Sequence, residues 1–337
     1  MRAKTVCGYL MIFFATVFFL PLSFSVGAEP VPVIFDTDMG NDIDDALALA
    51  ILHAGIERGR CDLLAVTVTK PGTAAAEYIQ MVNSWYRHPD IPIGVTTKDI
   101  LPESGRYLEK ITAAAREKFQ WESKKYDTAV PVLRRALAAA ADGSVVMVQV
   151  GFSTNLADLL DSPADDISPL SGRELVAQKV RLLLMMAGGF TEEYKAHKEF
   201  NVVNDVPSAQ KLASEWPTPI QFSGFEIGPV ISMPSQSMND DYGWTDWHPV
   251  RNSYEAYCGL DKSAWAWDLT CALVAIYPDE GFFDMSQPGT VTVRDDGTTC
   301  FTAAADGKHA IFLMPSAEQA ARVRQAFALL CSEPRKN

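Results

Sequence analysis

The stretch VPVIFDTDMGNDIDDALALAI, residues 31–51, places an apolar run before a group of aspartates and an Ala/Leu-rich run after it. The first run predicts a short buried strand, and the spacing of residues 44–55 predicts a helix that ends near Gly55. The aspartates therefore follow the carboxyl end of a strand, which is where open α/β sheets bind ligands. They are Asp36, Asp38, Asp42, Asp44 and Asp45.

Helix capping accounts for only part of this negative charge. One aspartate at the N-cap and one in the first turn would satisfy backbone N–H groups and complement the helix dipole. Five carboxylates within ten residues repel one another unless a cation lies among them. Carboxylate oxygens suit Ca²⁺ or Mg²⁺, so the stretch indicates a divalent-metal site, and Gly40 allows a sharp turn there.

Two common motifs do not describe the stretch. An EF-hand loop beginning at the first aspartate would need Asp or Asn at position five, Gly at six and Glu at twelve, where this chain has Gly40, Asn41 and Leu47. A phosphatase-type D-x-D pair would use Asp36 as nucleophile and Asp38 as acid, with Mg²⁺. That interpretation leaves unexplained the two aspartates that run directly into the helix.

The rest of the chain predicts an α/β fold. Apolar runs alternate with segments of helical spacing, which favours parallel pairing of the strands. The runs lack clean apolar–polar alternation, as is typical of strands covered on both faces. The predicted strands are residues 61–68, 91–95, 144–151, 180–189 and 219–228, and the predicted helices are 74–87, 128–143 and 153–160.

The carboxyl-terminal part of the chain differs from this alternation. Residues 289–303 predict a hairpin that turns at Asp296-Gly297. Residues 315–330 predict a helix that begins with a capping box at Ser316. We find no internal repeat and no low-complexity linker. We therefore predict one domain over residues 29–337, with a mostly parallel sheet and helices on both of its faces.

The first residues have the features of a secretory signal peptide. Arg2 and Lys4 precede the apolar core YLMIFFATVFFLPL, and SVGA supplies small residues for cleavage after Ala28. An uncleaved anchor is the alternative, because the apolar stretch approaches the length of a bilayer span. Pro21 and the small residues favour cleavage. We therefore predict a signal peptide over residues 1–28 and an exported protein, periplasmic or secreted, that is free of the membrane after cleavage.

Charge and cysteine content exclude two classes of function. The formal charge of −13 argues against a nucleic-acid partner, because phosphate neutralisation needs clustered Lys and Arg. The cysteines after residue 28 are odd in number and include no C-x-x-C pair, so no zinc site is indicated. Export would permit one disulfide, and burial of the cysteines as small apolar residues is the other interpretation.

Four segments together resemble the inosine-uridine preferring nucleoside hydrolase family. DTDMGNDIDDALALA, residues 36–50, is similar to the family's D-x-D-P-G-x-D-D-A signature, and VQVGFSTNLADLL is similar to its central G-x-x-T-N segment. MMAGGF followed by EFNVVND resembles its M-G-G and E-F-N elements, and WDLTCALVAIY resembles its late H-D-P segment. The order and approximate spacing agree across nearly the whole chain after residue 28.

The resemblance implies an enzyme that hydrolyses the N-glycosidic bond of ribonucleosides at a Ca²⁺ ion held at the carboxyl ends of the strands. It implies that Asp38 is the general base. The implied metal ligands are Asp38, Asp45, the backbone carbonyl of Val150, and Asp268. The implied contacts to the sugar are Asp44, Glu199, Asn201 and Asp268.

The chain departs from the family pattern in three places. GNDIDD holds two residues more than G-x-D-D, so Asp42 competes with Asp45 for one ligand position. We favour Asp45, because it directly precedes the helix. Trp267 stands where the family has His; it cannot protonate the leaving base, but its ring can stack on a nucleobase. The chain reads TKPGTAA after the strand at 61–68, where the family often has Gly-Asn.

Further residues have both a functional and a structural interpretation. Residues 235–248 predict a loop over the base, in which His248 either replaces the missing acid or is a surface residue without a role. The two tryptophans of that segment either belong to such a loop or anchor local packing. Glu226 either contacts the ligand or forms a surface salt bridge. Asn155 is expected to satisfy backbone groups at a turn.

Three functions remain open at this point. The first is an exported Ca²⁺-dependent nucleoside hydrolase of purine or pyrimidine salvage. The second is a hydrolase of another ribosyl substrate on the same scaffold, and the third is a non-catalytic ribose-binding protein that keeps the metal site. The resemblance also implies a homo-oligomer, a dimer or a tetramer, with a small nucleoside as its ligand.

Overall fold

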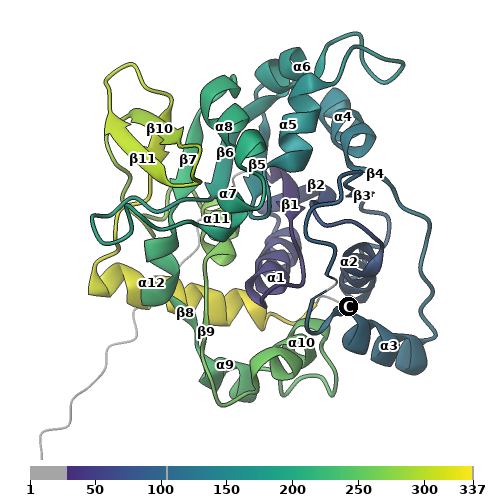
Figure 1. Ribbon diagram of the computed structural model, residues 1–337. Coiled ribbons are helices and arrows are strands. Elements are labelled where there is room, and N and C mark those ends of the chain that lie inside the picture. The colour runs from purple at the N-terminus through teal and green to yellow at the C-terminus, as the bar shows by residue number, and fades with distance from the viewer. Residues whose placement is uncertain (1–28, 104, 336–337) are drawn as a thin grey trace, which may run out of the picture.

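The computed structural model describes residues 29–103 and 105–335, so the predicted signal peptide lies outside the described residues. A central sheet lies between helices that cover both of its faces (Figure 1), as the sequence predicts. Among the described residues, no helix has the length and apolar character needed to cross a membrane.

The sheet contains ten strands in the order β11-β10-β12-β7-β6-β5-β1-β2-β3-β4. Neighbours from β12 to β4 pair in parallel, and β10 and β11 form an antiparallel end. The strands are β1 (Val31–Thr37), β2 (Cys61–Val68), β3 (Ile93–Val95), β4 (Asp127–Thr128), β5 (Val145–Gln149), β6 (Val180–Met186), β7 (Ile220–Ser223), β10 (Gly289–Val293), β11 (Thr299–Ala303) and β12 (His309–Ile311). A separate antiparallel pair joins β8 (Ser232–Met233) to β9 (Ala264–Trp265).

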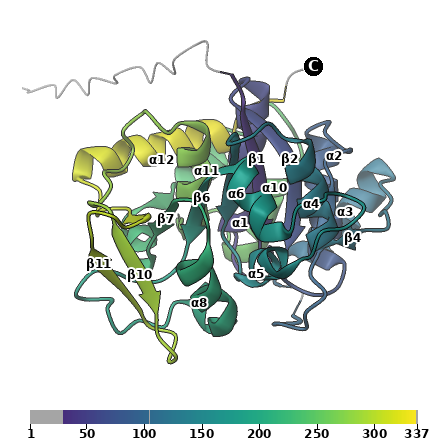
Figure 2. The ribbon, with the colours of Figure 1, turned by 90° about the horizontal axis from the view of Figure 1, so that it is seen from above.

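Two layers of helices cover the sheet. One layer consists of α1 (Asp44–Glu57), α2 (Ala74–Trp85), α3 (Leu108–Phe119), α9 (Ser235–Asp240), α10 (Pro249–Cys258), α11 (Asp268–Ile276) and α12 (Ala317–Cys331). The other consists of α4 (Ala129–Ala139), α5 (Thr154–Asp161), α6 (Gly172–Lys179), α7 (Phe200–Val203) and α8 (Val206–Glu215). Figure 2 shows α12 and α8 on opposite sides of β6 and β7.

Two hydrophobic cores follow from this arrangement. Val33 and Phe35 of β1 belong to the core beneath α1 and α11, whereas Ile34 belongs to the core beneath α4 and α5. Successive side chains of a strand point to opposite faces, so a strand with helices on both sides buries every residue. This explains why the central strands read as continuous apolar runs.

Some elements differ in extent from the prediction. Helix α4 ends at Ala139 rather than at Gly143. The strand predicted at 219–228 ends at Ser223 and is followed by the 3₁₀-helix η1 (Phe225–Val230), which contains Pro229, a residue without an N–H for a strand ladder. The hairpin turn at Asp296-Gly297 and the capping box at Ser316 are confirmed.

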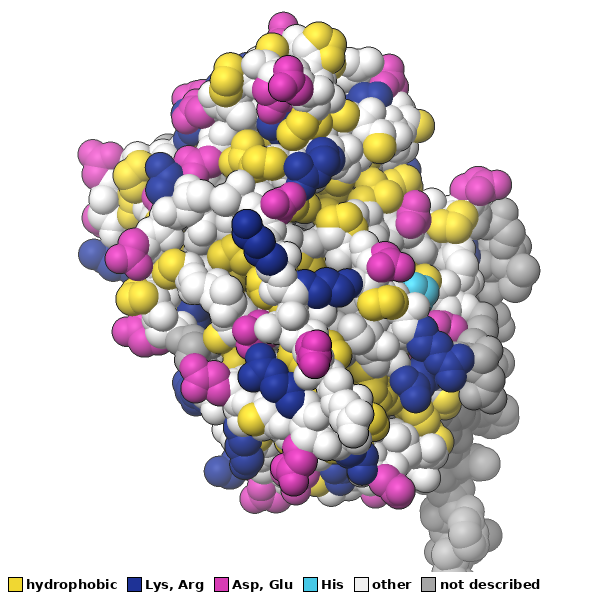
Figure 3. Space-filling view, turned by 90° about the vertical axis from the view of Figure 1, so that its right-hand side faces the viewer, with side chains coloured by type: hydrophobic (Ala, Val, Ile, Leu, Met, Phe, Trp, Pro, Cys, Tyr) yellow, Lys and Arg dark blue, Asp and Glu magenta, His cyan; other side chains and the backbone are white. Residues whose placement is uncertain are grey.

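The five cysteines among the described residues are all free. Cys61, Cys271 and Cys331 are buried in the core, as small apolar residues commonly are. On the face drawn in Figure 3, the side chains of Lys and Arg are interspersed with those of Asp and Glu.

Candidate active site

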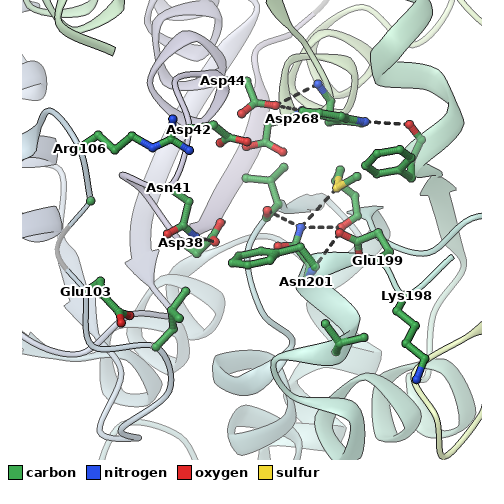
Figure 4. A pocket seen from close by; sticks show the side chains of 18 of the residues that line it. Asp38, Asn41, Asp42, Asp44, Glu103, Arg106, Lys198, Glu199, Asn201 and Asp268 are labelled. Carbon is green, nitrogen blue, oxygen red and sulfur yellow. Dashed lines mark hydrogen bonds between the residues drawn. The ribbon is translucent and has the colours of Figure 1, made fainter. Parts of the chain in front are cut away.

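A cavity of about 930 Å³ opens at the carboxyl ends of β1, β5 and β6 (Figure 4). Most residues that the sequence singled out line it together, although they come from distant parts of the chain: Asp38, Asp42, Asp44, Val150, Glu199, Asn201, Trp267 and Asp268. Asp45 lies behind this lining and is fully buried. The cavity therefore occupies the edge at which open α/β sheets bind ligands.

Close approach of two strand ends brings Asp38 next to Val150. A Cβ at Gly151 would lie only 2.4 Å from the backbone nitrogen of Asp38, so no larger residue fits there. The N–H of Val150 donates to the carbonyl of Asp36 at 2.8 Å, which continues the pairing of β1 with β5 up to the site. Gly40, with φ of 116°, then turns the chain toward α1.

Four carboxylates gather at the amino ends of α1 and α11. One oxygen from each of Asp42, Asp44, Asp45 and Asp268 lies within 4.8 Å of the others. Burial, followed by the charges of neighbouring carboxylates, raises the pKa of Asp45 and of Asp268 well above the ordinary value. The protein thus holds acidic groups where their charges are unfavourable unless a cation accompanies them.

The donor set fits a hard divalent cation. Oδ1 of Asp44 and Oδ2 of Asp45 are buried and have no hydrogen-bond partner among the described residues. Such oxygens are costly to bury unless they are paired or bind a metal. Oxygen donors suit Ca²⁺ or Mg²⁺. Asp42 and Asp45, which the sequence left as competing ligands, both belong to the cluster.

Asp38 lies beside the cluster and lines the cavity. Its side chain is 4% exposed. Burial raises the pKa of Asp38 to about 7, and the charge of Lys70 opposes this rise. The amide of Asn41 donates a hydrogen bond to Oδ2 of Asp38. A carboxylate with a pKa near neutrality is well matched to accept a proton from water.

Glu199 and Asn201 form the wall opposite Asp38 (Figure 4). Glu199 caps α7, and its Oε1 accepts the N–H of Asn201 at 2.8 Å. The amide of Asn201 donates to the carbonyl of Val150 at 2.9 Å and to that of Met186 at 3.1 Å. Both residues therefore cap and brace the loops as well as line the cavity.

Trp267 contributes an aromatic wall at the start of α11. Its indole N–H donates to the carbonyl of Phe225 at 2.8 Å, and its ring centroid is 5.3 Å from that of Phe225. The ring of His197 also packs against that of Phe225, with centroids 4.0 Å apart. All three side chains line the cavity, with neighbouring rings tilted by 34° and 39°, so they present aromatic rings to a ligand.

The segment at 235–248 does not close over this cavity, so that prediction is wrong. The indole N–H of Trp244 donates to the carbonyl of Ser332 just after α12, at 3.0 Å. His248 is neither an acid of the site nor a surface residue. It is fully buried, 4.3 Å from the ring of Trp85, and its Nδ1 accepts the N–H of Arg251 at the start of α10. Burial lowers the pKa of His248 to about 3.

Glu226 and Asn155 have structural contacts. Glu226 is buried rather than salt-bridged at the surface, and its carboxylate accepts the N–H of Phe190 at 3.1 Å. Asn155 donates to the carboxylate of Asp36 at 2.8 Å, not to backbone groups at a turn. Neither side chain lines the cavity.

Several lining or supporting residues were not found from the sequence. Asn41 lies in GNDIDD, the stretch that is two residues longer than the family pattern, and Lys70 lies in TKPGTAA, the third departure. Neither departure indicated that the two side chains meet. His197 precedes the E-F-N element by two positions. Arg106, whose guanidinium stacks 4.9 Å above the ring of Tyr257, follows no local pattern.

Comparisons with known proteins agree with this geometry. The sequence model of the inosine-uridine preferring nucleoside hydrolase family matches residues 33–327. No curated protein sequence matches the chain.

Solved structures share the fold at low identity. A plant nucleoside hydrolase superposes with a TM-score of 0.69 at 18% identity, covering 90% of this chain and 100% of its own. A purine-preferring ribonucleoside hydrolase from Gardnerella vaginalis gives 0.65 at 14% identity, covering 89% and 99%. The type III effector XopQ, complexed with adenosine diphosphate ribose, gives 0.64 at 14% identity, covering 91% and 94%.

Proposed function

The chain belongs to the inosine-uridine preferring nucleoside hydrolase family, and from this premise we propose that it hydrolyses the N-glycosidic bond of ribonucleosides to ribose and free base with Ca²⁺ as cofactor. Asp38 is the general base of this proposal. The observation that carries it is the convergence of Asp38, Asp44 and Asp268 on one cavity, with Asp45 directly behind them.

The residues proposed to hold the cation are Asp38, Asp45, Asp268 and the carbonyl of Val150. Asp42 is the alternative to Asp45, since both lie within the cluster of oxygens. A bound Ca²⁺ would hold the vicinal hydroxyls of a ribose and acidify a water molecule.

Asp38 accepts a proton from the attacking water. As the water oxygen bonds to the anomeric carbon, the C–N bond breaks and its electrons leave with the base. The transition state is oxocarbenium-like, with positive charge on the sugar. The carboxylates that line the cavity favour that charge more than they favour the neutral substrate, which lowers the barrier.

The walls of the cavity position the substrate. Asp44 accepts a hydrogen bond from a ribose hydroxyl on one side, and Glu199 with Asn201 meets the sugar on the other, near its 5′-hydroxyl. The base stacks on Trp267 beside Phe225. Trp267 has no acidic proton for the leaving base, so the substrates favoured by this site are those whose base leaves readily.

The test is product chromatography of a panel of purine and pyrimidine nucleosides with the Ca²⁺-loaded protein. We expect free base and ribose from at least one nucleoside, and Asp38→Ala should reduce the rate by about 10²–10⁴-fold while the fold remains. Wild-type rates in that variant would exclude Asp38 as the base. Ribose binding without turnover of any riboside would instead support the non-catalytic alternative.

A second candidate is a larger ribosyl substrate. A second cavity of about 350 Å³ adjoins the first and shares Asp42, Tyr257 and Trp267 with it. Trp265 lines this second cavity and is 55% exposed, so its ring is available to a ligand. XopQ, which shares the fold, is complexed with adenosine diphosphate ribose. Turnover of dinucleotide-type ribosides, with none of simple nucleosides, would favour this candidate.

We also propose that the mature protein is exported and acts in nucleoside salvage outside the cytoplasm as a homo-oligomer. The amino-terminal pattern at residues 1–28 motivates the location, and membership of the family motivates the assembly. Cell fractionation tests the location. An exported protein should be recovered outside the cytoplasm and without those residues. Light scattering of the purified protein tests assembly, and a monomer mass would contradict it.

A further inference from the structure

Lys70 is a buried lysine beside the acidic site. Its side chain is 1% exposed, although lysines rarely lose contact with water unless they are paired. Its Nζ donates to Oδ1 of Asn41 at 2.9 Å, and Nδ2 of Asn41 donates in turn to Oδ2 of Asp38. A chain of two hydrogen bonds therefore joins this cation to the proposed general base.

Strand pairing places Lys70 there. The N–H of Thr69 donates to the carbonyl of Thr37 at 2.9 Å, so the pairing of the two chains continues from the last residue of β1 to the residue after β2. The next residue on each strand is then Asp38 and Lys70. Asn41, which belongs to the lengthened aspartate signature, lies between their side chains (Figure 4 shows Asn41 beside Asp38).

The charge of Lys70 acts on several carboxylates at once. Burial lowers the pKa of the lysine, and the charges of neighbouring carboxylates oppose this shift; they belong to Asp38, Asp45, Glu103 and Asp42. Its hydrogen bond, however, goes to the neutral amide of Asn41. Lys70 thus opposes the repulsion within the acidic group without occupying the space between the carboxylates.

We propose that Lys70 is a positioning residue that serves the acidic site in two ways. Through Asn41 it fixes the orientation of the Asp38 carboxylate, and its charge offsets part of the repulsion that a divalent cation otherwise offsets alone. This rests on the proposed function for the identity of the base. Two consequences follow: the site keeps its shape without metal, and metal binds more weakly than it would beside a neutral side chain.

The experiment compares the wild type with Lys70→Met, which keeps the length of the side chain and removes its charge. Calorimetric titration with Ca²⁺ should give a dissociation constant about tenfold lower for the variant, because a repelling charge has been removed. Its melting temperature without metal should fall, and its rise on adding Ca²⁺ should exceed that of the wild type. With nucleoside, kcat should fall while KM changes little.

Arg134→Met is the matched control. Arg134, on α4, is equally buried at 1% exposed, but it pairs with Asp165 and does not line the cavity. The Arg134→Met variant should lose the same amount of stability with and without Ca²⁺, and its Ca²⁺ affinity should match that of the wild type. The same behaviour in Lys70→Met, with unchanged affinity and equal losses, would overturn the proposal.

Asn41→Ala keeps the proposal testable if Lys70→Met does not fold. It removes the link to Asp38, so kcat should fall about tenfold or more with the fold intact. Unchanged kcat would overturn the positioning role. Where both single variants fold, kcat of the double variant should fall by a smaller factor than the product of the two single fold-losses in kcat. A loss equal to that product would overturn the link from Lys70 through Asn41 to Asp38. Ca²⁺ affinity and melting temperature can be measured without enzymatic activity. If the wild type is inactive but the variants change Ca²⁺ affinity and melting temperature as expected, only the proposed reaction is contradicted.

Discussion

Asp44 and Trp267 are joined across 223 positions of the chain: Oδ2 of Asp44 accepts the backbone N–H of Trp267 at 2.9 Å. The same oxygen accepts the N–H of Asp268 at 3.2 Å. A side chain from the first turn of α1 therefore caps α11, and the amino ends of two helices face one group of carboxylates. Because helix amino ends favour negative charge, this contact lets the first and the last signature segments share a site.

Replacing Asp44 separates its two contributions. Asp44→Ala removes the acceptor for α11, so we expect a loss of about 1 kcal/mol in the free energy of unfolding. Asp44→Asn keeps an oxygen acceptor and removes a charge from the cluster, so its free energy of unfolding without metal should be at least that of the wild type. It should still reduce kcat/KM, because its amide cannot replace a carboxylate. Denaturant unfolding and nucleoside kinetics check these outcomes. Equal destabilisation by both variants would contradict the capping role.

Gly228→Ala should disturb the aromatic wall without touching a carboxylate. A Cβ at Gly228 would lie 2.0 Å from Nε1 of Trp267, so the indole must move and lose its bond to the carbonyl of Phe225. We expect KM for nucleosides to rise, with a stability loss of about 1–3 kcal/mol. Gly243→Ala is the control, because a Cβ there meets nothing within 4 Å. Similar KM values in the two variants would remove Trp267 from base binding.

His248 should make the protein sensitive to acid. Its pKa is lowered from 6.5 to about 3 by burial, so the unfolded chain binds a proton that the folded protein does not. Above pH 6.5 this histidine is neutral in both states and does not lower the free energy of unfolding. As the pH falls from 6.5 toward 3, protonation of the unfolded chain lowers that free energy by up to about 1.4 kcal/mol per pH unit.

His248→Asn removes this titration and keeps a side-chain oxygen that can cap α10. We expect a shallower loss of stability between pH 6.5 and 3, measured by denaturant unfolding at a series of pH values, and an unchanged kcat. A steep drop in kcat with normal stability would restore this histidine as an acid of the reaction.

Replacing Asp268 should raise the stability of the metal-free protein and lower the stability that Ca²⁺ adds. Neutralising it in Asp268→Asn removes a buried charge that neighbouring carboxylates oppose, so the metal-free variant should melt at a higher temperature than the metal-free wild type. Ca²⁺ at 100 times its dissociation constant should stabilise the wild type by about 2.7 kcal/mol. The variant should gain little, and a full Ca²⁺ response in it would exclude Asp268 as a ligand.

Much of the framework could be predicted from local patterns. The bounds of β2 agree with the apolar run at 61–68, and the turn at Asp296-Gly297 needs the positive φ of Gly297, 83°. These features depend on residues adjacent in the chain, where periodicity and turn chemistry act. The place of Asp38 and Asp44 at the carboxyl edge of the sheet was also accessible, because parallel strands end there. That Asp268 joins them was implied only by the resemblance of the signature segments to the family.

Other features depended on which surfaces pack together, and no local pattern carries that information. Segment 235–248 was predicted to be a loop over the base, yet its His248 is buried against Trp85 of α2, and the hydroxyl of Tyr242 donates to the carbonyl of Cys331 in α12. Lys70 reaches Asn41 only because β1 and β2 lie side by side. Burial and the pKa values that follow from it arise from contacts between residues distant in sequence, so the polar environment of the site was decided by the folded chain.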